Sequence, residues 1–473
     1  MTNPATVVRP VATANFDAVK NVSASSYGPI VILGGTAWTP EGARRADLRV
    51  AGGAIAEVGD LAPLPGERVI DATGLHVLPG MIDAHVHVDD TVGGCELADT
   101  FPTASELAVR TGVTTLAGFA TQRPGETLAG ALERCRARAR GRTHCDVHFH
   151  LTPTAWPWPW DEVERLVAGG CTTFKLYTTY REAGLYTSYE RLAEVMGRLA
   201  PLGARLLVHC EDDETLRAVD VSTLDRADPH EHARLRPEAA EVAAVGRVVD
   251  LAARTGCPVH IVHVSTADAL ARIAAGRSRA AVTCETAPHY LLLGEASLSG
   301  RNGHRFLCTP PLRAAVTRAR LEADAAAGAF DLFATDHCAF TRADKDAERE
   351  DFRAVPSGIA GVGALVPTLF ELLVVRHRLG LGELATRLAA NPAKLLGIYP
   401  KKGAIAAGSD ADVVVVDPAG PRRPVVSTLA DAYETYPGRT TTWDVRHVLR
   451  SGETVVADGA LVAPGRPTGR VLA

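Results

Sequence analysis

The middle of the chain alternates between short apolar runs and longer segments of helical composition, and this rhythm constrains the fold more than any other feature. Apolar runs such as TTFKLYTT, ARLLVHCE and DLFATDH are separated by Ala-, Arg-, Glu- and Leu-rich stretches such as YERLAEVMGRLAPLG. Strand–helix repetition over roughly 300 residues, from 79 to 395, predicts an α/β fold with a parallel, TIM-like (β/α)8 barrel. Continuous apolar runs suit strands that are buried on both faces.

The two ends of the chain have a different, β-rich pattern. Residues 27–78 contain IVILGGTAWT and ADLRVAGGAIAEVGD, and residues 396–473 contain KKGAIAAGSDADVVVVDP and VRHVLRSGETVVADGALV. Short alternating runs with Gly, Asp and Pro between them are typical of antiparallel strands. We therefore expect a small β-sandwich domain formed from both chain ends, preceded by a flexible N-terminal lead-in at residues 1–26.

Composition excludes several classes of function. The 473 residues carry a formal net charge of -5, and their basic residues are dispersed, so we expect no nucleic-acid partner. The nine cysteines include no C-x-x-C pair, which indicates reduced thiols in a cytoplasmic protein. The N-terminus lacks the apolar region of a signal peptide, and no apolar run approaches the roughly 20 residues that cross a bilayer, so we expect no membrane association.

Six potential metal ligands follow one another in the barrel region, each at or near the end of an apolar run. In a (β/α)8 barrel, chemistry takes place at the C-terminal ends of the strands, where side chains from distant parts of the sequence meet. A set of this composition predicts a two-metal site that hydrolyses a bond in a polarised substrate. The six residues are His85, His87, Lys175, His209, His263 and Asp336.

The histidines and the lysine each have an alternative interpretation. His85 and His87 are two apart, so on a strand both would face one ion, although a pair of ordinary loop histidines is the alternative. Burial of Lys175 among Thr, Phe, Leu and Tyr would lower its pKa, and a neutral amine can add CO2 to become a carbamate that bridges two cations; otherwise its ammonium reaches the surface. His260 competes with His263, because residues three apart on a strand face opposite sides and only one of them would point inward.

Asp336 and Tyr180 are the candidate catalytic residues. Metal binding lowers the pKa of a bound water and gives a hydroxide nucleophile, whose proton Asp336 would accept and then pass to the leaving nitrogen. Tyr180 could donate its hydroxyl to the developing oxyanion. The alternatives are a helix-capping aspartate and a tyrosine at the barrel rim.

The segments VLPGMIDAHVH, TTFKLYTTY, CETAPHYLLL, LCTPPLR and TDHCAF resemble the cyclic amidohydrolases of the amidohydrolase superfamily: hydantoinase/dihydropyrimidinase, allantoinase and dihydroorotase. The resemblance spans roughly residues 29–460. It implies a binuclear zinc centre in which His85, His87 and Asp336 hold one ion, His209 and His263 hold the other, and N6-carboxylated Lys175 bridges them. It also implies that Tyr180, Thr309 and Ser357 bind the substrate.

Among these enzymes the chain is most similar to hydantoinases. Dihydroorotases have an arginine two residues after the second histidine of H-x-H, where this chain has Asp89. The expected activity is hydrolysis of a cyclic amide C–N bond in a hydantoin, dihydropyrimidine or related cyclic ureide or imide by a metal-bridging hydroxide. The alternatives are an allantoinase- or dihydroorotase-type amidohydrolase and a metal-free scaffold protein. The resemblance further implies a small-molecule cyclic amide as partner and a homo-oligomer, tetramer or dimer.

Overall fold

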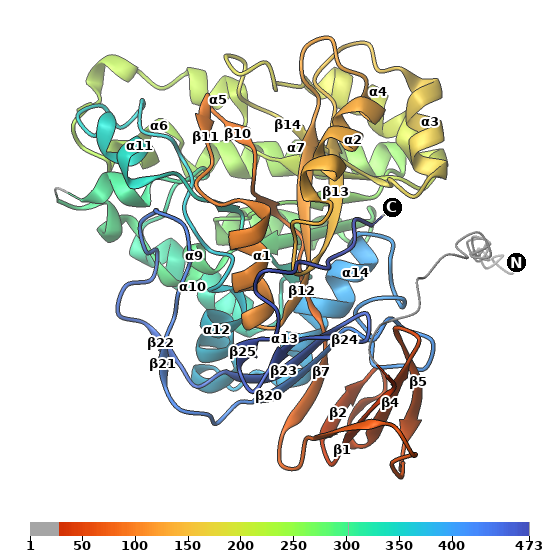
Figure 1. Ribbon diagram of the computed structural model, residues 1–473. Coiled ribbons are helices and arrows are strands. Elements are labelled where there is room, and N and C mark those ends of the chain that lie inside the picture. Colours follow the sequence, from red (N-terminus) through yellow and green to blue (C-terminus); the bar gives the residue numbers. More distant parts are fainter. Residues whose placement is uncertain (1–27, 301, 473) are drawn as a thin grey trace, which may run out of the picture.

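Eight parallel strands form the centre of the molecule in the computed structural model, which describes residues 28–300 and 302–472 (Figure 1). The predicted lead-in at 1–26 lies outside the described residues. Neighbouring strands pair in parallel in the order β18-β17-β16-β15-β14-β13-β12-β8. The strands are β8 (Met81–Asp83), β12 (Val113–Thr121), β13 (Asp146–Thr152), β14 (Thr173–Tyr177), β15 (Arg205–His209), β16 (Val259–Ile261), β17 (Val282–Thr286) and β18 (Leu332–Phe333).

The first and last strands of the barrel meet through two short extensions. β9 (Val86–His87) pairs in parallel with β19 (His337–Cys338), with Val86 opposite His337. At the end of β8, the carboxylate of Asp83 accepts hydrogen bonds from the backbone N–H of Thr335 at 3.0 Å and from its hydroxyl at 2.5 Å. This seam brings β8 and β18 together, and the predicted TIM-like barrel is confirmed.

Helices cover the outside of the barrel because their apolar residues recur at helical spacing. In α4 (Tyr189–Leu199), the buried residues are Leu192, Val195, Met196 and Leu199, which form one stripe. Hydroxyl side chains begin several helices; the Thr127 hydroxyl, for example, accepts a hydrogen bond from the Gly130 N–H at the start of α2.

The other helices lie between the barrel strands or follow the last of them. They are α1 (Phe101–Arg110), α2 (Leu128–Ala139), α3 (Trp160–Ala168), α5 (Asp213–Arg217), α6 (Glu231–Leu235), α7 (Glu238–Thr255), α8 (Ala267–Gly276), α9 (Pro288–Leu292), α10 (Ala315–Ala326), α11 (Arg342–Ala347), α12 (Leu365–Leu369), α13 (Leu381–Ala385) and α14 (Asn391–Leu395). Short 3-10 helices lie at Ala200–Leu202, Val221–Thr223, Glu295–Leu298 and Gly303–Phe306, and π-helical segments at Phe370–Arg376 and Thr386–Ala390.

Strands from both ends of the chain share one sheet, as Figure 1 shows in red and blue. One sheet has the order β5-β4-β1-β6 and the other β25-β24-β23-β20-β7-β2-β3. Their bounds are β1 (Ile30–Leu33), β2 (Thr36–Thr39), β3 (Gly42–Arg45), β4 (Asp47–Ala51), β5 (Ala54–Gly59), β6 (Arg68–Asp71), β7 (His76–Pro79), β20 (Val413–Asp417), β23 (Asp444–Arg450), β24 (Glu453–Ala457) and β25 (Ala460–Leu461). Two-residue strands form the pairs β10 (Thr91–Val92) with β11 (Cys95–Glu96), and β21 (Arg423–Pro424) with β22 (Thr440–Thr441).

Strand β20 shows why this β domain packs against the barrel. Val413 and Val415 face an apolar core between the two sheets, whereas Val414 and Val416 join the large core around the barrel helices. Successive side chains of a strand point to opposite faces, so a run of four valines serves both cores. The predicted β-sandwich from both chain ends is confirmed; its limits at 78/79 and 395/396 stay a prediction.

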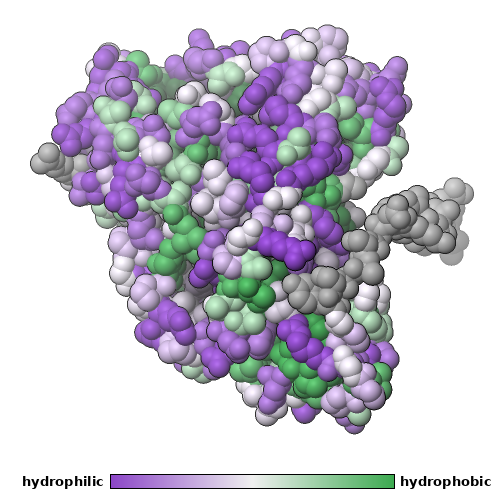
Figure 2. All heavy atoms as spheres, in the orientation of Figure 1, coloured by the Kyte–Doolittle hydropathy of each residue, from purple (hydrophilic) through white to green (hydrophobic). Residues whose placement is uncertain are grey.

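The surface is mainly hydrophilic on the face drawn in Figure 2, where hydrophobic residues form small separate patches. Among the described residues, no helix has the length and apolar character needed to cross a membrane.

Candidate active site and metal centre

A cavity of about 400 Å³ lies at the C-terminal ends of the barrel strands. All nine predicted site residues line it, although they come from separate strands and loops. The structure therefore brings together what the sequence placed far apart, while the chemical role of each residue stays a prediction. The nine residues are His85, His87, Lys175, Tyr180, His209, His263, Thr309, Asp336 and Ser357.

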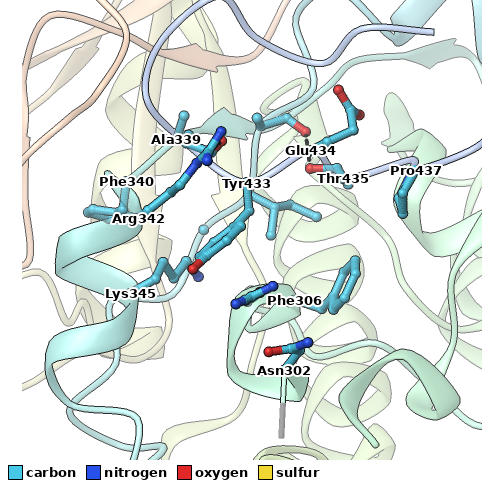
Figure 3. A pocket seen from close by; sticks show the side chains of 15 residues that line it. Asn302, Phe306, Ala339, Phe340, Arg342, Lys345, Tyr433, Glu434, Thr435 and Pro437 are labelled. Atoms are coloured by element: carbon cyan, nitrogen blue, oxygen red, sulfur yellow. Dashed lines mark hydrogen bonds between the residues drawn. The ribbon is translucent and has the colours of Figure 1, made fainter. Parts of the chain in front are cut away.

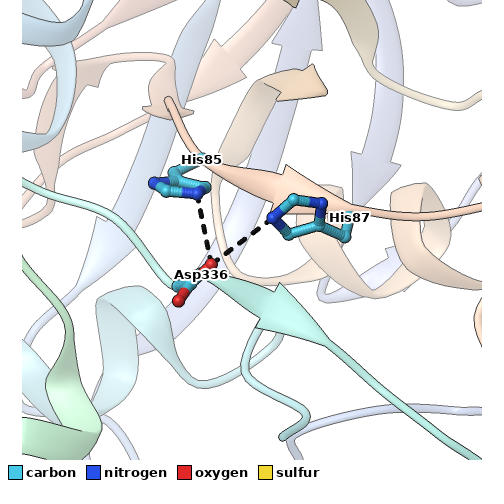
Figure 4. A group of neighbouring side chains, drawn as sticks. All are labelled: His85, His87 and Asp336. Carbon is cyan, nitrogen blue, oxygen red and sulfur yellow. Dashed lines mark ion pairs between the residues drawn. The ribbon is translucent and has the colours of Figure 1, made fainter. Parts of the chain in front are cut away.

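The first potential ion site lies at the barrel seam, where β9 and β19 pair (Figure 4). The Nε2 atoms of His85 and His87 lie 3.2 Å and 3.5 Å from the same carboxylate oxygen of Asp336. Burial opposes ionisation of Asp336, but the neighbouring His85 and His87 lower its pKa to about 2. The three side chains offer two imidazole nitrogens and an anionic oxygen to one point, which is a donor set suited to a divalent ion.

The second potential ion site is formed by two histidines from neighbouring strands. His209 ends β15 and its Nδ1 lies 2.9 Å from the Nε2 of His263. The other ring nitrogen of His209 lies 2.7 Å from the carboxylate of Glu211. Burial opposes ionisation of Glu211, but Arg236, at 2.8 Å, and His209 lower its pKa to about 2. A carboxylate behind a histidine fixes the ring and leaves the opposite nitrogen for a metal.

Lys175 lies on β14, lines the same cavity and is 1% exposed. Its Nζ lies 5.3 Å and 5.2 Å from the ring centres of Phe119 and Tyr177. Burial lowers the pKa of Lys175 to about 8, against the opposing charges of Asp336 and Glu285. The side chain therefore points into the barrel and not to the surface.

The prediction that only one of His260 and His263 points inward is wrong. Strand β16 ends at Ile261, so the alternation of faces does not extend to His263, which has a φ of 39°. The Nε2 of His260 lies 3.1 Å from the carboxylate of Glu285, and this carboxylate also lies 2.5 Å from the Nδ1 of His85. Both side chains therefore lie in the barrel interior. His263 lines the cavity, and His260 lies beneath it.

Three of the seven non-glycine residues with a positive φ in the described part of the chain line the cavity. Tyr180, His263 and Asp336 have φ values of 70°, 39° and 49°, a region that residues other than glycine rarely occupy. Such conformations persist where surrounding contacts hold them, and they occur preferentially at functional sites.

Five further residues of the site were missed in the sequence. Glu211 and Glu285 contact potential ligands, Arg236 and His232 line the cavity, and His289 also lines it with an Nε2 that is buried and has no partner among the described residues. The signals for the two carboxylates were their positions, two residues after His209 and near the end of the run AAVTCET.

A tryptophan-rich segment and Asp89 lie outside the cavity. The tryptophans of TAWPWPWDEV stack on one another, and Trp158 packs on Phe174 with ring centres 5.6 Å apart; none of them lines the cavity. Asp89 pairs with Arg138 and Arg142, each at 2.8 Å, so its carboxylate faces helix α2.

A second group of carboxylates also satisfies simple metal-binding geometry: Asp146, Asp410 and Asp412. Lys402 lies 2.8 Å from the carboxylate of Asp146, and Arg470 lies 2.7 Å from Asp146 and 2.6 Å from Asp410. Because protein cations already neutralise these carboxylates, we interpret the cluster as a structural ion network.

The donor set around the cavity fits two metal ions. Four imidazoles converge in pairs, Asp336 is ionised, and the buried Lys175 lines the same cavity. Imidazole and carboxylate ligands suit zinc, manganese or cobalt.

Comparison with known proteins agrees with this geometry. The chain matches the amidohydrolase family over residues 76–455. It is 34% identical to the D-hydantoinase of Ralstonia pickettii, over 93% of this chain and 97% of that protein, and 33% identical to the D-hydantoinase of Streptomyces coelicolor, over 90% and 94%. The crystal structure of dihydropyrimidinase from Brevibacillus agri superposes with a TM-score of 0.89 at 32% identity, covering 94% and 98% of the two chains. This chain therefore belongs to the amidohydrolase family, whose binuclear metal centre its cavity fits, and is a cyclic amidohydrolase.

Proposed function

We propose that this protein opens a hydantoin or dihydropyrimidine ring by hydrolysing its amide C–N bond in the cavity at the barrel mouth. The observation that carries the proposal is the convergence of His85, His87 and Asp336 on one point and of His209 and His263 on a neighbouring one. The relatives support the ring class, since their names are D-hydantoinase and dihydropyrimidinase.

We assign the ligands as follows. His85, His87 and Asp336 would hold one divalent ion, and His209 and His263 would hold the second. Lys175, whose pKa is lowered to about 8 by burial, would add CO2 at its neutral Nζ, lose a proton and bridge both ions as a carbamate. When bound, such a pair of ions lowers the pKa of a water and polarises the substrate carbonyl.

The protein side chains would carry the proton and stabilise developing charge. Asp336 is ionised, so its carboxylate can accept a proton from the attacking water and then deliver it to the ring nitrogen as the C–N bond breaks. Burial raises the pKa of Tyr180. Its hydroxyl therefore stays protonated and can donate a hydrogen bond to the carbonyl oxygen as that oxygen becomes negative.

The substrate ring would be held by the loops that follow the strands. Thr309 and Ser357 line the same cavity as Tyr180 and offer backbone and hydroxyl groups to a cyclic amide. Apolar residues complete the lining and suit a ring substituent: Val92, Leu185, Leu235, Phe340 and Phe352. The size of the cavity, about 400 Å³, accommodates a small substituted ring.

We also propose zinc as the metal and a cytoplasmic homo-oligomer, tetramer or dimer. The nine cysteines are all free, which supports a reducing compartment. Light scattering coupled to size-exclusion chromatography tests the oligomeric state.

The function is tested by metal analysis and a hydrolysis screen on the same preparation. We expect about two divalent ions per chain and hydrolysis of hydantoins or dihydropyrimidines in preference to allantoin, dihydroorotate and simple imides. A metal-loaded protein that opens none of these rings would contradict the proposal. A preparation that binds no divalent metal would favour the scaffold alternative.

A further inference from the structure

A second cavity, of about 430 Å³, lies next to the active-site cavity and has a different lining. Three cations and three aromatic rings dominate it, and we call it the basic cavity: Arg305, Arg342, Lys345, Phe306, Phe340 and Tyr433. Figure 3 shows Tyr433 in the middle of this group, with Arg342 and Lys345 on one side and Phe306 on the other.

Lys345 is the most unusual member. It is 3% exposed, and in the described part of the chain its Nζ has one hydrogen bond, donated to the carbonyl oxygen of Leu307 at 2.9 Å. Burial lowers its pKa to about 8, and no carboxylate is among the groups that oppose this shift. A buried ammonium without an anionic partner is costly, which indicates that an anion would stabilise it.

Within the described part of the chain, Arg305 also lacks hydrogen-bond partners for part of its guanidinium group. Its guanidinium carbon lies 3.9 Å from the ring centre of Tyr433, and its Nε is buried without a hydrogen-bond partner among the described residues. Stacking on a tyrosine holds the guanidinium in place but satisfies none of its N–H donors.

Two carboxylates near the basic cavity, Glu434 and Asp346, form no salt bridge with Arg305 or Lys345 among the described residues. Asp346, outside the lining, accepts a hydrogen bond from the Tyr433 hydroxyl at 2.6 Å and lies 2.7 Å from the Nε2 of His304. Glu434 accepts hydrogen bonds from the backbone N–H groups of Ser427 and Tyr436, each at 2.9 Å, and from the Ser427 hydroxyl. Arg342 pairs with the exposed Asp431 at 3.2 Å, a solvent-exposed contact of small energetic value.

We propose that the basic cavity binds a small organic carboxylate, with its carboxylate at Lys345 and Arg305 and its apolar or aromatic part against Phe306, Phe340 and Tyr433. Guanidinium and ammonium groups form charge-assisted hydrogen bonds with a carboxylate, and the rings provide apolar contact area. The site is separate from the metal ligands, none of which lines it. Its nearness to the active site comes from Phe340 and Gly358, which line both cavities.

Calorimetric titration of the metal-loaded protein with phenylacetate tests the proposal. We expect binding of phenylacetate, at least tenfold weaker binding of the neutral analogue phenylacetamide, and at least tenfold weaker phenylacetate binding in Arg305→Met. Lys345→Met should show the same loss; because Lys345 is buried, the partly exposed Arg305 is the safer variant.

Arg353→Met is the matched control, because Arg353 lines the active-site cavity and not the basic cavity. This variant should bind phenylacetate as the unmodified protein does. The proposal is overturned if Arg353→Met loses binding while Arg305→Met keeps it, since the ligand would then occupy the active site. It is also overturned if phenylacetate and phenylacetamide bind equally, or if inorganic phosphate binds and phenylacetate does not.

Discussion

His85 and Glu285 are joined by a 2.5 Å contact between the imidazole Nδ1 and the carboxylate. Both side chains are buried, and the opposite nitrogen of His85 faces Asp336. His260 contacts the other oxygen of Glu285 at 3.1 Å. Glu285 therefore fixes the orientation of His85 from beneath the cavity, although it does not itself line the cavity.

Replacement of Glu285 by glutamine should weaken metal binding. Loss of a carboxylate behind a ligating histidine typically costs about 10–100-fold in metal affinity. Competition with a chromophoric chelator measures this directly and does not depend on turnover. Glu322→Gln is the matched control, since Glu322 is also buried but lies in α10 and pairs with Arg318 and His377. Equal metal affinity in the two variants would exclude the role of Glu285.

Lys175→Ala should abolish ring opening and reduce the bound metal together, because a carbamate on this side chain would bridge both ions. Metal content by mass spectrometry and hydrolysis of a hydantoin are measured on the same sample. Lys394→Ala, at an exposed position of α14, should change neither property. If Lys175→Ala retained full metal content, the bridging role would be wrong.

The barrel and the convergence of the candidate ligands on one cavity could be predicted because they leave local signals. His85, His209 and Lys175 each stand in or directly after an apolar run, and a parallel barrel brings the ends of such runs together. Glu285 and Arg236 could not be assigned in this way. Glu285 contacts His85, which is 200 positions away in the sequence, and Arg236 contacts Glu211, which is 25 positions away.

His263 shows a different limit of sequence reasoning. The alternation rule failed there because β16 stops two residues earlier and the backbone turns to a positive φ. The basic cavity gave no signal at all, because its arginines and lysine are scattered between residues 305 and 345 with ordinary spacing.

Asp146→Asn should destabilise the fold. Asp146 is fully buried and contacts Lys402 at 2.8 Å, Arg450 at 3.0 Å and Arg470 at 2.7 Å, so the variant removes one carboxylate partner from each of three cations. Breaking a buried ion pair in this way costs about 3–5 kcal/mol of unfolding free energy. Thermal unfolding compares the variant with the control Asp60→Asn, which is exposed and should be close to neutral.

The effect of Asp146 should also depend on pH. Burial opposes ionisation, but Lys402, Arg470 and Arg450 hold the pKa of Asp146 well below its usual range in the folded state. Its contribution is therefore fully present above the unfolded-state pKa of about 4 and is lost as the pH falls below that value. The stability difference between the unmodified protein and Asp146→Asn should shrink in acid, and a difference that grew would contradict this assignment.

Gly358→Ala should lower the hydrolytic activity, because it shifts a segment that lines the active-site cavity. A Cβ at Gly358 would lie 2.5 Å from the carbonyl oxygen of Cys338 and 2.9 Å from its Sγ, so the segment carrying Ser357 must shift. The backbone N–H of Gly358 also donates to the carbonyl of Leu307 at 2.9 Å, which ties this segment to the one carrying Thr309. Since both Ser357 and Thr309 line the cavity, we expect kcat/KM for a hydantoin to fall about tenfold, equivalent to ~1.4 kcal/mol.

Gly197→Ala is the control for this substitution, because a Cβ at this position in α4 meets no other atom within 4 Å. Alanine in a helix is favoured over glycine by about 1 kcal/mol, so this variant should be slightly more stable and equally active. Steady-state kinetics are measured on both variants after their metal content is confirmed to be equal. A lower kcat/KM then reports displacement of the segment that lines the cavity and not loss of the metal ions. Unchanged kcat/KM in Gly358→Ala would show that the position of Ser357 does not limit substrate binding.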